Sequence, residues 1–115
     1  MVVGYSDELT GAALAGDDMQ GIVKKVLVSP TEGWEGWSMR LFEVAPAGHT
    51  PRHRHDWPHI NVVLAGSGTL HIDGTDHVLR AGAYAYVPAG ALHQFRAAAE
   101  EPLSFVCIVP AEGDA

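Results

Sequence analysis

The chain has 115 residues and a mass of 12.2 kDa, which is the size of one domain. Seven Lys and Arg residues face 14 Asp and Glu residues, and the resulting net charge of −7 repels phosphate backbones, so we expect no nucleic-acid partner. The single cysteine, Cys107, excludes an internal disulfide framework and a cysteine-based zinc finger. The N-terminus lacks a signal-peptide pattern, and no stretch reaches the roughly 18 apolar residues of a membrane helix. We therefore expect a cytoplasmic protein without a membrane partner.

In chain order, the sequence predicts a loose N-terminal arm over residues 1–20, a barrel domain over 21–110 and a short polar tail over 111–115. Within the arm, only residues 9–14 have the pattern of a brief helical turn. Alternating and β-branched patterns predict strands at 22–28, 37–44, 60–65, 69–72, 75–79, 84–87, 92–96 and 103–109. Glycine and proline predict a loop at 29–36 and turns at 45–48, 66–68, 80–82 and 88–90. Many short strands separated by turns indicate an all-β sandwich or barrel.

Asp73-Gly74, between two alternating segments, is the strongest hairpin signal in the chain. Both central residues of the tightest hairpin turn need a positive φ, which glycine and aspartate tolerate well. We therefore expect residues 69–72 and 75–79 to pair as neighbouring antiparallel strands.

Four of the seven histidines lie between residues 49 and 59. His53 and His55 are two residues apart, so on a strand they share a face at roughly 7 Å and can converge on one ion. His59 follows after a bend that Pro58 imposes, and His93 comes from a later predicted strand. Neutral imidazole is the commonest ligand of first-row divalent ions, and a cation would compensate for clustering these rings. The sequence thus predicts a four-histidine metal site, with a polar cluster that holds no ion as the alternative.

With this histidine pattern the chain resembles the cupins, whose first motif is matched by Gly48, His53, His55, His59 and Gly66. Their second motif is matched by Gly82, Pro88, Gly90 and His93. The resemblance implies a single-domain, jelly-roll β-barrel of the cupin type. It departs from the usual pattern twice, because His59 stands where a glutamate is usual and Ala97 where an asparagine is usual. The first departure changes the ligand set from three imidazoles and a carboxylate to four imidazoles.

Two flanking segments, 39–42 and 105–110, together with His53–His59, are similar to small four-histidine monocupins that bind manganese. That resemblance implies a homodimer, a small-molecule substrate and oxidative cleavage of an alkene C=C bond. Apolar outer strands such as 22–28 and the loose arm offer surfaces for a partner copy. Manganese is the expected ion, with iron, zinc, nickel and copper as alternatives.

Further site residues follow from strand parity and from the resemblance. Arg40 is either a solvated arginine on the outer face or an inner cation that orients an anionic or peroxidic ligand. Cys107 is either a small buried hydrophobe or, as the resemblance implies, part of the inner wall that faces the metal. We retain Arg40 and Cys107 as catalytic candidates. The substrate-pocket candidates are Trp57, Phe95, Phe105 and Val109.

The remaining histidines are weaker candidates. His49 shares strand parity with His53, but Pro51 intervenes, so a position at the surface or the entrance is expected. His71 and His77 flank the Asp73-Gly74 turn and are expected to be exposed.

Three functions are compatible with these residues. The first is a metal-dependent oxygenase-type enzyme that cleaves a small aromatic or apolar alkene. The second is a zinc-dependent polyketide cyclase or isomerase, in which the ion polarises a carbonyl group. The third is a ligand-binding cupin module without turnover. The sequence alone does not separate them.

Overall fold

The computed structural model describes residues 1–114, which form one antiparallel β structure with three short 3-10 helices. The strands are β1 (Ala12–Leu14), β2 (Gln20–Val28), β3 (Trp37–His49), β4 (His59–Ile72), β5 (Thr75–Arg80), β6 (Tyr84–Val87), β7 (His93–Ala97) and β8 (Leu103–Pro110). The 3-10 helices are η1 (Ser6–Glu8), η2 (Pro30–Glu32) and η3 (Ala111–Asp114). No helix in the described part is long and apolar enough to cross a membrane.

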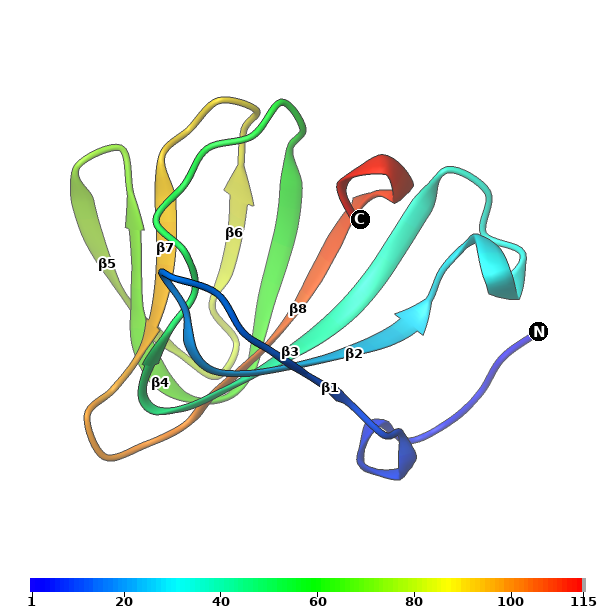
Figure 1. The fold of residues 1–115 in the computed structure, drawn as a ribbon, viewed down its shortest axis with the longest axis horizontal. Coiled ribbons are helices and arrows are strands. Elements are labelled where there is room, and N and C mark those ends of the chain that lie inside the picture. Colours follow the sequence, from blue (N-terminus) through cyan, green and yellow to red (C-terminus); the bar gives the residue numbers. More distant parts are fainter. Residues whose placement is uncertain (115) are drawn as a thin grey trace.

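The strands curve into a closed barrel with extra strands at its edges (Figure 1). The main hydrogen-bonded order is β1-β2-β3-β7-β4-β5. Strand β8 pairs with both β3 and β4, which draws the two longest strands together, and β6 adds to β4. The prediction of a single-domain, all-β jelly-roll barrel is confirmed.

The predicted hairpin is confirmed, with β4 paired to β5 around Asp73 at φ 46° and Gly74 at φ 84°. The predicted turns at 45–48 and 66–68 are wrong, because β3 and β4 continue through them. At Gly66 and Gly68, a Cβ atom would overlap the carbonyl oxygens of Pro102 and Arg96. These glycines therefore allow neighbouring backbones to approach a continuous strand, which is a tertiary effect.

The N-terminal arm packs on its own barrel. The expected helical turn at 9–14 is wrong, because η1 ends at Glu8 and residues 12–14 form the edge strand β1. β1 pairs with β2, with Ala13 opposite Val23. Lys25 Nζ also donates a hydrogen bond to the Ser6 carbonyl oxygen at 3.0 Å. The arm thus covers an edge of its own sheet.

Three stacked phenylalanines connect the apolar core to the wall of a cavity. The Phe105 ring stacks on Phe95 with centroids 4.2 Å apart and on Phe42 with centroids 5.5 Å apart. Fully buried residues such as Val44, Leu103 and Val109 belong to the same core. The rings of Phe95 and Phe105 are also part of the wall of a cavity of about 310 Å³, so the core directly supports this cavity.

Candidate metal centre

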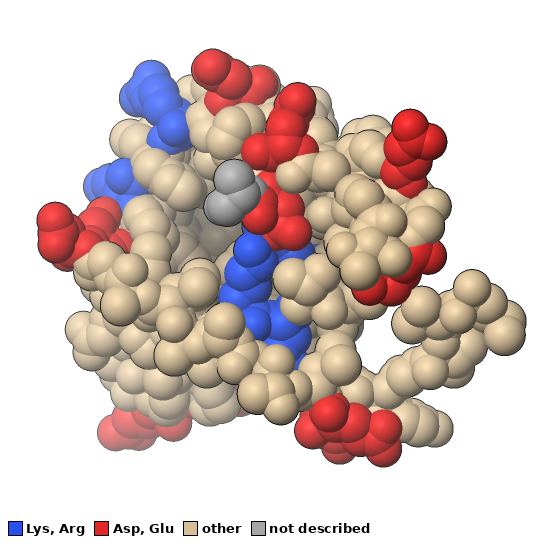
Figure 2. All heavy atoms as spheres, turned by 45° about the vertical axis from the view of Figure 1, so that its right-hand side comes forward, with Lys and Arg blue, Asp and Glu red and all other residues tan. Residues whose placement is uncertain are grey.

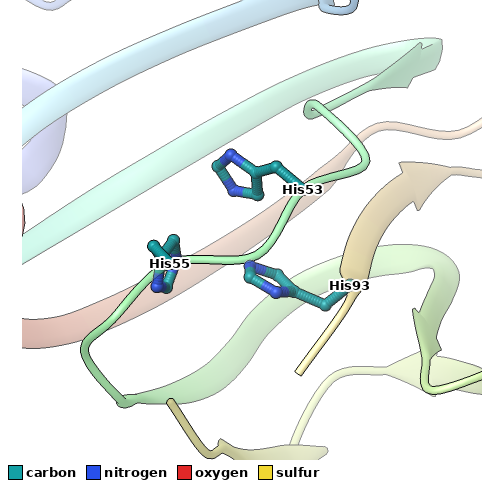
Figure 3. Close-up of side chains that lie close together, drawn as sticks. All are labelled: His53, His55 and His93. Carbon is teal, nitrogen blue, oxygen red and sulfur yellow. The ribbon is translucent and has the colours of Figure 1, made fainter. Parts of the chain in front are cut away.

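His53, His55 and His93 lie close together, as Figure 3 shows. His53 and His55 belong to the segment between β3 and β4, whereas His93 is the first residue of β7. The backbones of His53 and His93 exchange two hydrogen bonds, at 3.1 and 3.0 Å, in an isolated antiparallel bridge. This bridge brings together histidines that are 40 positions apart in the sequence. One ring nitrogen from each histidine lies within 4.8 Å of the others.

His59, the first residue of β4, extends this trio. Its Nε2 lies 3.2 Å from Nε2 of His93, and its ring centroid lies 5.3 Å from that of His55. The structure therefore brings all four predicted histidines to one place, with His59 linked chiefly through His93.

Hydrogen bonds determine the tautomers of three of these rings. His55 Nδ1 lies 2.9 Å from the Trp57 carbonyl oxygen, and His93 Nδ1 lies 2.9 Å from that of Ala91. His59 Nδ1 lies 2.6 Å from Oδ1 of Asn61. These oxygens only accept, so each Nδ1 carries the hydrogen and each Nε2 presents a lone pair. The same support of a ring by an oxygen is typical of metal-ligating histidines.

Burial favours the neutral form of three of these rings, those of His53, His59 and His93. It lowers the pKa of His59 to about 4, against the effect of the Asn61 hydrogen bond, which raises it. Burial also lowers the pKa of His53 and of His93, with neighbouring histidines adding to the effect. Neutral imidazole is the form that ligates a metal, so these three rings are in the competent state at neutral pH.

The donor set fits a divalent ion. The Nε2 atoms of His59 and His93 present lone pairs toward each other at 3.2 Å, which is unfavourable without a cation between them. Two nitrogens bound at about 2.1 Å and at a right angle are roughly 3 Å apart. The observed separation is therefore that of two adjacent ligands of one ion.

A cavity of about 310 Å³ opens beside the four histidines. Trp57, Phe95 and Phe105 line it, and the Trp57 ring stacks on His55 with centroids 4.7 Å apart. Val109, the fourth predicted pocket residue, is fully buried in the core and lies outside the described wall of this cavity. Val109 points to the inner face of β8, as its spacing from Cys107 predicts, but there it packs in the apolar core.

Arg40 lies inside the barrel, so the alternative of a solvated arginine on the outer face is wrong. Its Nη2 donates to Sγ of Cys107 at 3.0 Å, and its Cζ lies 5.0 Å from the centre of the Phe42 ring. Burial raises the pKa of the Cys107 thiol, although the Arg40 charge opposes that rise. The thiol is therefore neutral at neutral pH and is a poor nucleophile.

Arg40, Cys107 and Asn61 form a row across three neighbouring strands. Arg40 on β3 is opposite Cys107 on β8, which is opposite Asn61 on β4. Asn61 in turn contacts His59, so the row leads from the cation to the candidate metal centre. Sequence reasoning missed Asn61, although its spacing of two from His59 on a strand was a usable signal.

The other three histidines lie apart from the centre. His49 Nδ1 contacts the Thr50 carbonyl oxygen at 3.1 Å, and its side chain is half-buried. His77 is exposed, as expected. His71 is half-buried and not exposed, because it forms a 2.7 Å contact with Asp76 across the β4–β5 pair. Among the residues that sequence reasoning also missed are Leu14, Met19 and Lys24 in the wall of the cavity and Asp114 over it.

A barrel of this topology with clustered histidines beside an inner cavity is typical of the cupin class. Residues 40–109 match the cupin domain family, which is more than half of the chain, so the chain belongs to this family. Cupin relatives of the chain include enzymes, and the family's enzymes act on small molecules.

Two characterised relatives are similar in sequence. One is 1-methylthio-D-xylulose 5-phosphate methylsulfurylase of Rhodospirillum rubrum, which is 35% identical over 83% of this chain. The other is the dimethylsulfoniopropionate lyase DddW of Ruegeria pomeroyi, which is 40% identical over 46% of this chain. The chain spans only 60% and 35% of their respective lengths.

A solved structure shows the same fold. The polyketide cyclase RemF of Streptomyces resistomycificus superimposes with a TM-score of 0.90, over 96% of this chain and 80% of RemF. Sequence identity is 24%, so this likeness establishes the architecture alone.

Proposed function

We propose that the protein is a metal-dependent oxygenase-type enzyme that cleaves the C=C bond of a small aromatic or apolar alkene. The observation that carries this proposal is the convergence of imidazole nitrogens on a cavity lined by aromatic rings. An apolar pocket with a few convergent polar groups is the usual form of a small-molecule site.

His53, His55, His59 and His93 would hold the ion, and Asn61 would orient His59 from behind. Manganese or iron in this place would supply the electron transfer to dioxygen that the cleavage requires. In the overall reaction the C=C and O–O bonds break and two C=O bonds form. Dioxygen thus supplies both oxygen atoms, and no other oxidant is consumed. With hydrogen peroxide, two molecules deliver the same two oxygens and leave two waters.

The chain's own side chains bind and orient the substrate. The stacked rings of Phe42, Phe95 and Phe105 provide an apolar wall for an aryl or alkyl group, and they exclude water from it. Trp57 covers the His55 ring and narrows the cavity beside the ligands. Arg40 and Cys107 are positioned together by their 3.0 Å contact. We propose that Arg40 directs the polar end of the bound molecules and that Cys107 packs against the reacting region.

Product analysis tests the oxidative function. Protein loaded with manganese, iron or another first-row ion is incubated with 4-vinylphenol and dioxygen, and separately with hydrogen peroxide. The expected product is 4-hydroxybenzaldehyde, measured by chromatography. His93→Gln should abolish it, whereas His49→Gln, outside the centre, should retain it. Absence of aldehyde with every ion would overturn the proposal.

The strongest alternative is a zinc-dependent cyclase or isomerase. The same four imidazoles suit zinc, which can polarise a carbonyl group. Elemental analysis of protein purified without added metal separates the two functions. Full occupancy by zinc, with no aldehyde product, would favour the cyclase. Tight binding of small molecules without any turnover would favour a ligand-binding module.

We also propose a homodimer. The sequence suggested strand 22–28 as its surface, but Ile22 lies in the core and β1 covers the edge of β2. The larger exposed apolar surface lies on the paired strands β4 and β6, at Ile60, Val62, Leu64, Tyr84 and Tyr86. Patches of this kind usually mark contact surfaces. Light scattering should show a dimer that Leu64→Glu converts to a monomer and that Val26→Glu, on β2, leaves intact.

A further inference from the structure

A carboxylate of the chain lies over the cavity, bound to two cations. Asp114 Oδ1 is 2.6 Å from Lys24 Nζ and 3.1 Å from Arg40 Nη1. All three side chains are largely buried, with side-chain exposures of 18% for Lys24, 14% for Asp114 and 10% for Arg40. Asp114 belongs to η3, the short 3-10 helix that follows β8 and borders the cavity through Gly113. The contact therefore joins residues 74 and 90 positions apart along the chain.

The pairing of β2 with β3 places both cations on the inner face. Lys24 is opposite Phe42, and Arg40 is two residues from Phe42 on the same strand. Their side chains line the same cavity as the candidate metal ligands. Lys25, the next residue, points to the other face and contacts Glu43 at 3.1 Å. Figure 2 shows Lys and Arg atoms gathered at the centre of one face of the molecule, in contact with acidic atoms.

Concentrating positive charge here is unusual for this chain. Only seven Lys and Arg residues are present against 14 acidic residues, yet two of the seven converge inside one cavity. Desolvating a Lys or Arg side chain costs free energy unless an anion compensates for its charge. Asp114 supplies that anion, and the charges of Lys24 and Arg40 hold the pKa of its carboxyl below the usual value despite burial, which raises it.

Asp114 does not satisfy the pair completely. One carboxylate faces two cations, so a positive charge remains on the wall of the cavity. Arg40 is 9% exposed, and its Nε is buried without a hydrogen-bond partner among residues 1–114. Buried donors in folded proteins almost always have a partner. A guanidinium group binds a carboxylate or phosphate through two parallel hydrogen bonds, and Arg40 has a donor free for such a ligand.

We propose that Lys24 and Arg40 form a subsite for an anionic group of the substrate, and that Asp114 occupies this subsite until the substrate displaces it. The substrate would combine an aromatic or apolar body, which contacts Phe95 and Phe105, with a carboxylate or phosphate that contacts the two cations. η3 must then move away from the cavity when the anionic group binds. The proposal deepens the proposed function, on which it rests for the identity of the cavity as the substrate site.

The contacts of Asp114 indicate which anionic groups of a substrate the subsite can bind. Its single carboxylate reaches both cations through one oxygen, so a substrate carboxylate can make the same two contacts. A phosphate shares this anionic chemistry and offers additional oxygens to the free Nε of Arg40. Competition between the two probes therefore tells the sources apart.

Calorimetry on the metal-free protein tests the subsite, with trans-cinnamate as the probe and cinnamyl alcohol as its uncharged counterpart. Asp114→Asn removes the internal competitor and should tighten cinnamate binding about tenfold, because the competing charge-assisted contacts are lost. Binding of the alcohol should not change. Glu112→Gln, an exposed acid in the same helix, is the matched control and should have no effect.

The cations are tested in the Asp114→Asn background. Adding Lys24→Met should weaken cinnamate binding about tenfold, whereas adding Lys25→Met, on the opposite face, should not. Inorganic phosphate that displaces cinnamate would identify a general anion subsite, and phosphate that does not would identify a carboxylate subsite. Equal binding of cinnamate and the alcohol, or equal effects of Asp114→Asn and Glu112→Gln, would overturn the proposal.

These measurements are independent of the oxidative function, because they need neither metal nor turnover. If the protein forms no aldehyde but binds cinnamate through Lys24, the oxygenase proposal is wrong and the subsite is supported. If the protein forms aldehyde but binds cinnamate and cinnamyl alcohol equally, the subsite is wrong and the oxygenase proposal is supported. Circular dichroism of each variant verifies that the barrel is folded.

Discussion

The Nε2 atoms of His59 and His93 lie 3.2 Å apart, although both rings already donate their Nδ1 hydrogen to an oxygen. Neither Nε2 has a hydrogen to give to the other, so their proximity is a cost in the absence of a positive charge. A divalent ion between the two Nε2 atoms would replace this repulsion with two metal–nitrogen bonds. The same pair therefore explains both the expected metal affinity and the sensitivity of the centre to protons.

His93→Gln should weaken binding of manganese or zinc by more than about 100-fold, because a direct ligand contributes more than a supporting residue. The matched control is His49→Gln, since His49 is a half-buried histidine outside the cluster. Isothermal titration calorimetry with each metal measures the affinities of the two variants. Equal affinity in the two variants would show that His93 is not a ligand.

Asn61→Leu should weaken metal binding by about 10–100-fold while the barrel stays folded, because His59 loses the acceptor that orients its ring. Asn61→Asp keeps an acceptor oxygen in place and should retain most of the affinity. Both variants also remove the buried Nδ2 of Asn61, which has no hydrogen-bond partner within residues 1–114. If Asn61→Asp binds metal as weakly as Asn61→Leu, the orienting role is wrong.

The metal-free protein should lose stability as the pH falls from about 6.5 to about 4. In the unfolded chain His59 takes up a proton near pH 6.5, whereas in the folded protein it does so only near pH 4. The unfolded state thus binds more protons in this interval, and the free energy of unfolding decreases by about 3 kcal/mol. Urea denaturation at several pH values measures the slope, and His59→Gln should flatten it. A slope that is unchanged in His59→Gln would contradict this assignment.

Gly113→Val should displace η3 from the cavity, because a Cβ atom at residue 113 overlaps the indole ring of Trp57. The displaced segment withdraws Asp114 from Lys24 and Arg40, so cinnamate should bind more tightly, as in Asp114→Asn. Calorimetry measures this change, and Gly4→Val in the N-terminal arm is the control, because a Cβ atom at residue 4 meets nothing within 4 Å. Unchanged cinnamate affinity in Gly113→Val would show that η3 does not restrict access.

Cys107 should react slowly with iodoacetamide in the folded protein and rapidly in urea. Burial raises the pKa of its thiol, and the thiolate is the reactive form. Mass spectrometry over time measures the two rates. Arg40→Met removes the opposing positive charge and should slow the reaction further. Fast labelling of the folded wild-type protein would indicate an activated thiol and would support a nucleophilic role for Cys107.

Much of the fold was predictable because local chemistry determines it. The turn at Asp73-Gly74 needs residues that tolerate positive φ, and the strands on both sides follow from their alternating pattern. The predicted turn at 66–68 is wrong because β4 continues through it: Gly66 has a positive φ of 84°, but at Gly66 and Gly68 a distant strand also leaves no room for a Cβ atom. A single sequence does not distinguish a glycine required by a turn from a glycine required by a neighbouring backbone.

The sequence alone predicted the four-histidine cluster from the spacing of the histidines, and it predicted the barrel through the resemblance to the cupins. Only the tertiary structure decided that Arg40 points inward, that Val109 packs in the core, and that Lys24 and Asp114 meet over the cavity. The physical reason is distance along the chain. The regular spacing of the histidines is a local pattern that can be recognised in the sequence. The ion pair of Lys24 with Asp114, by contrast, joins a strand to a helix 90 residues later and forms only after the barrel has closed.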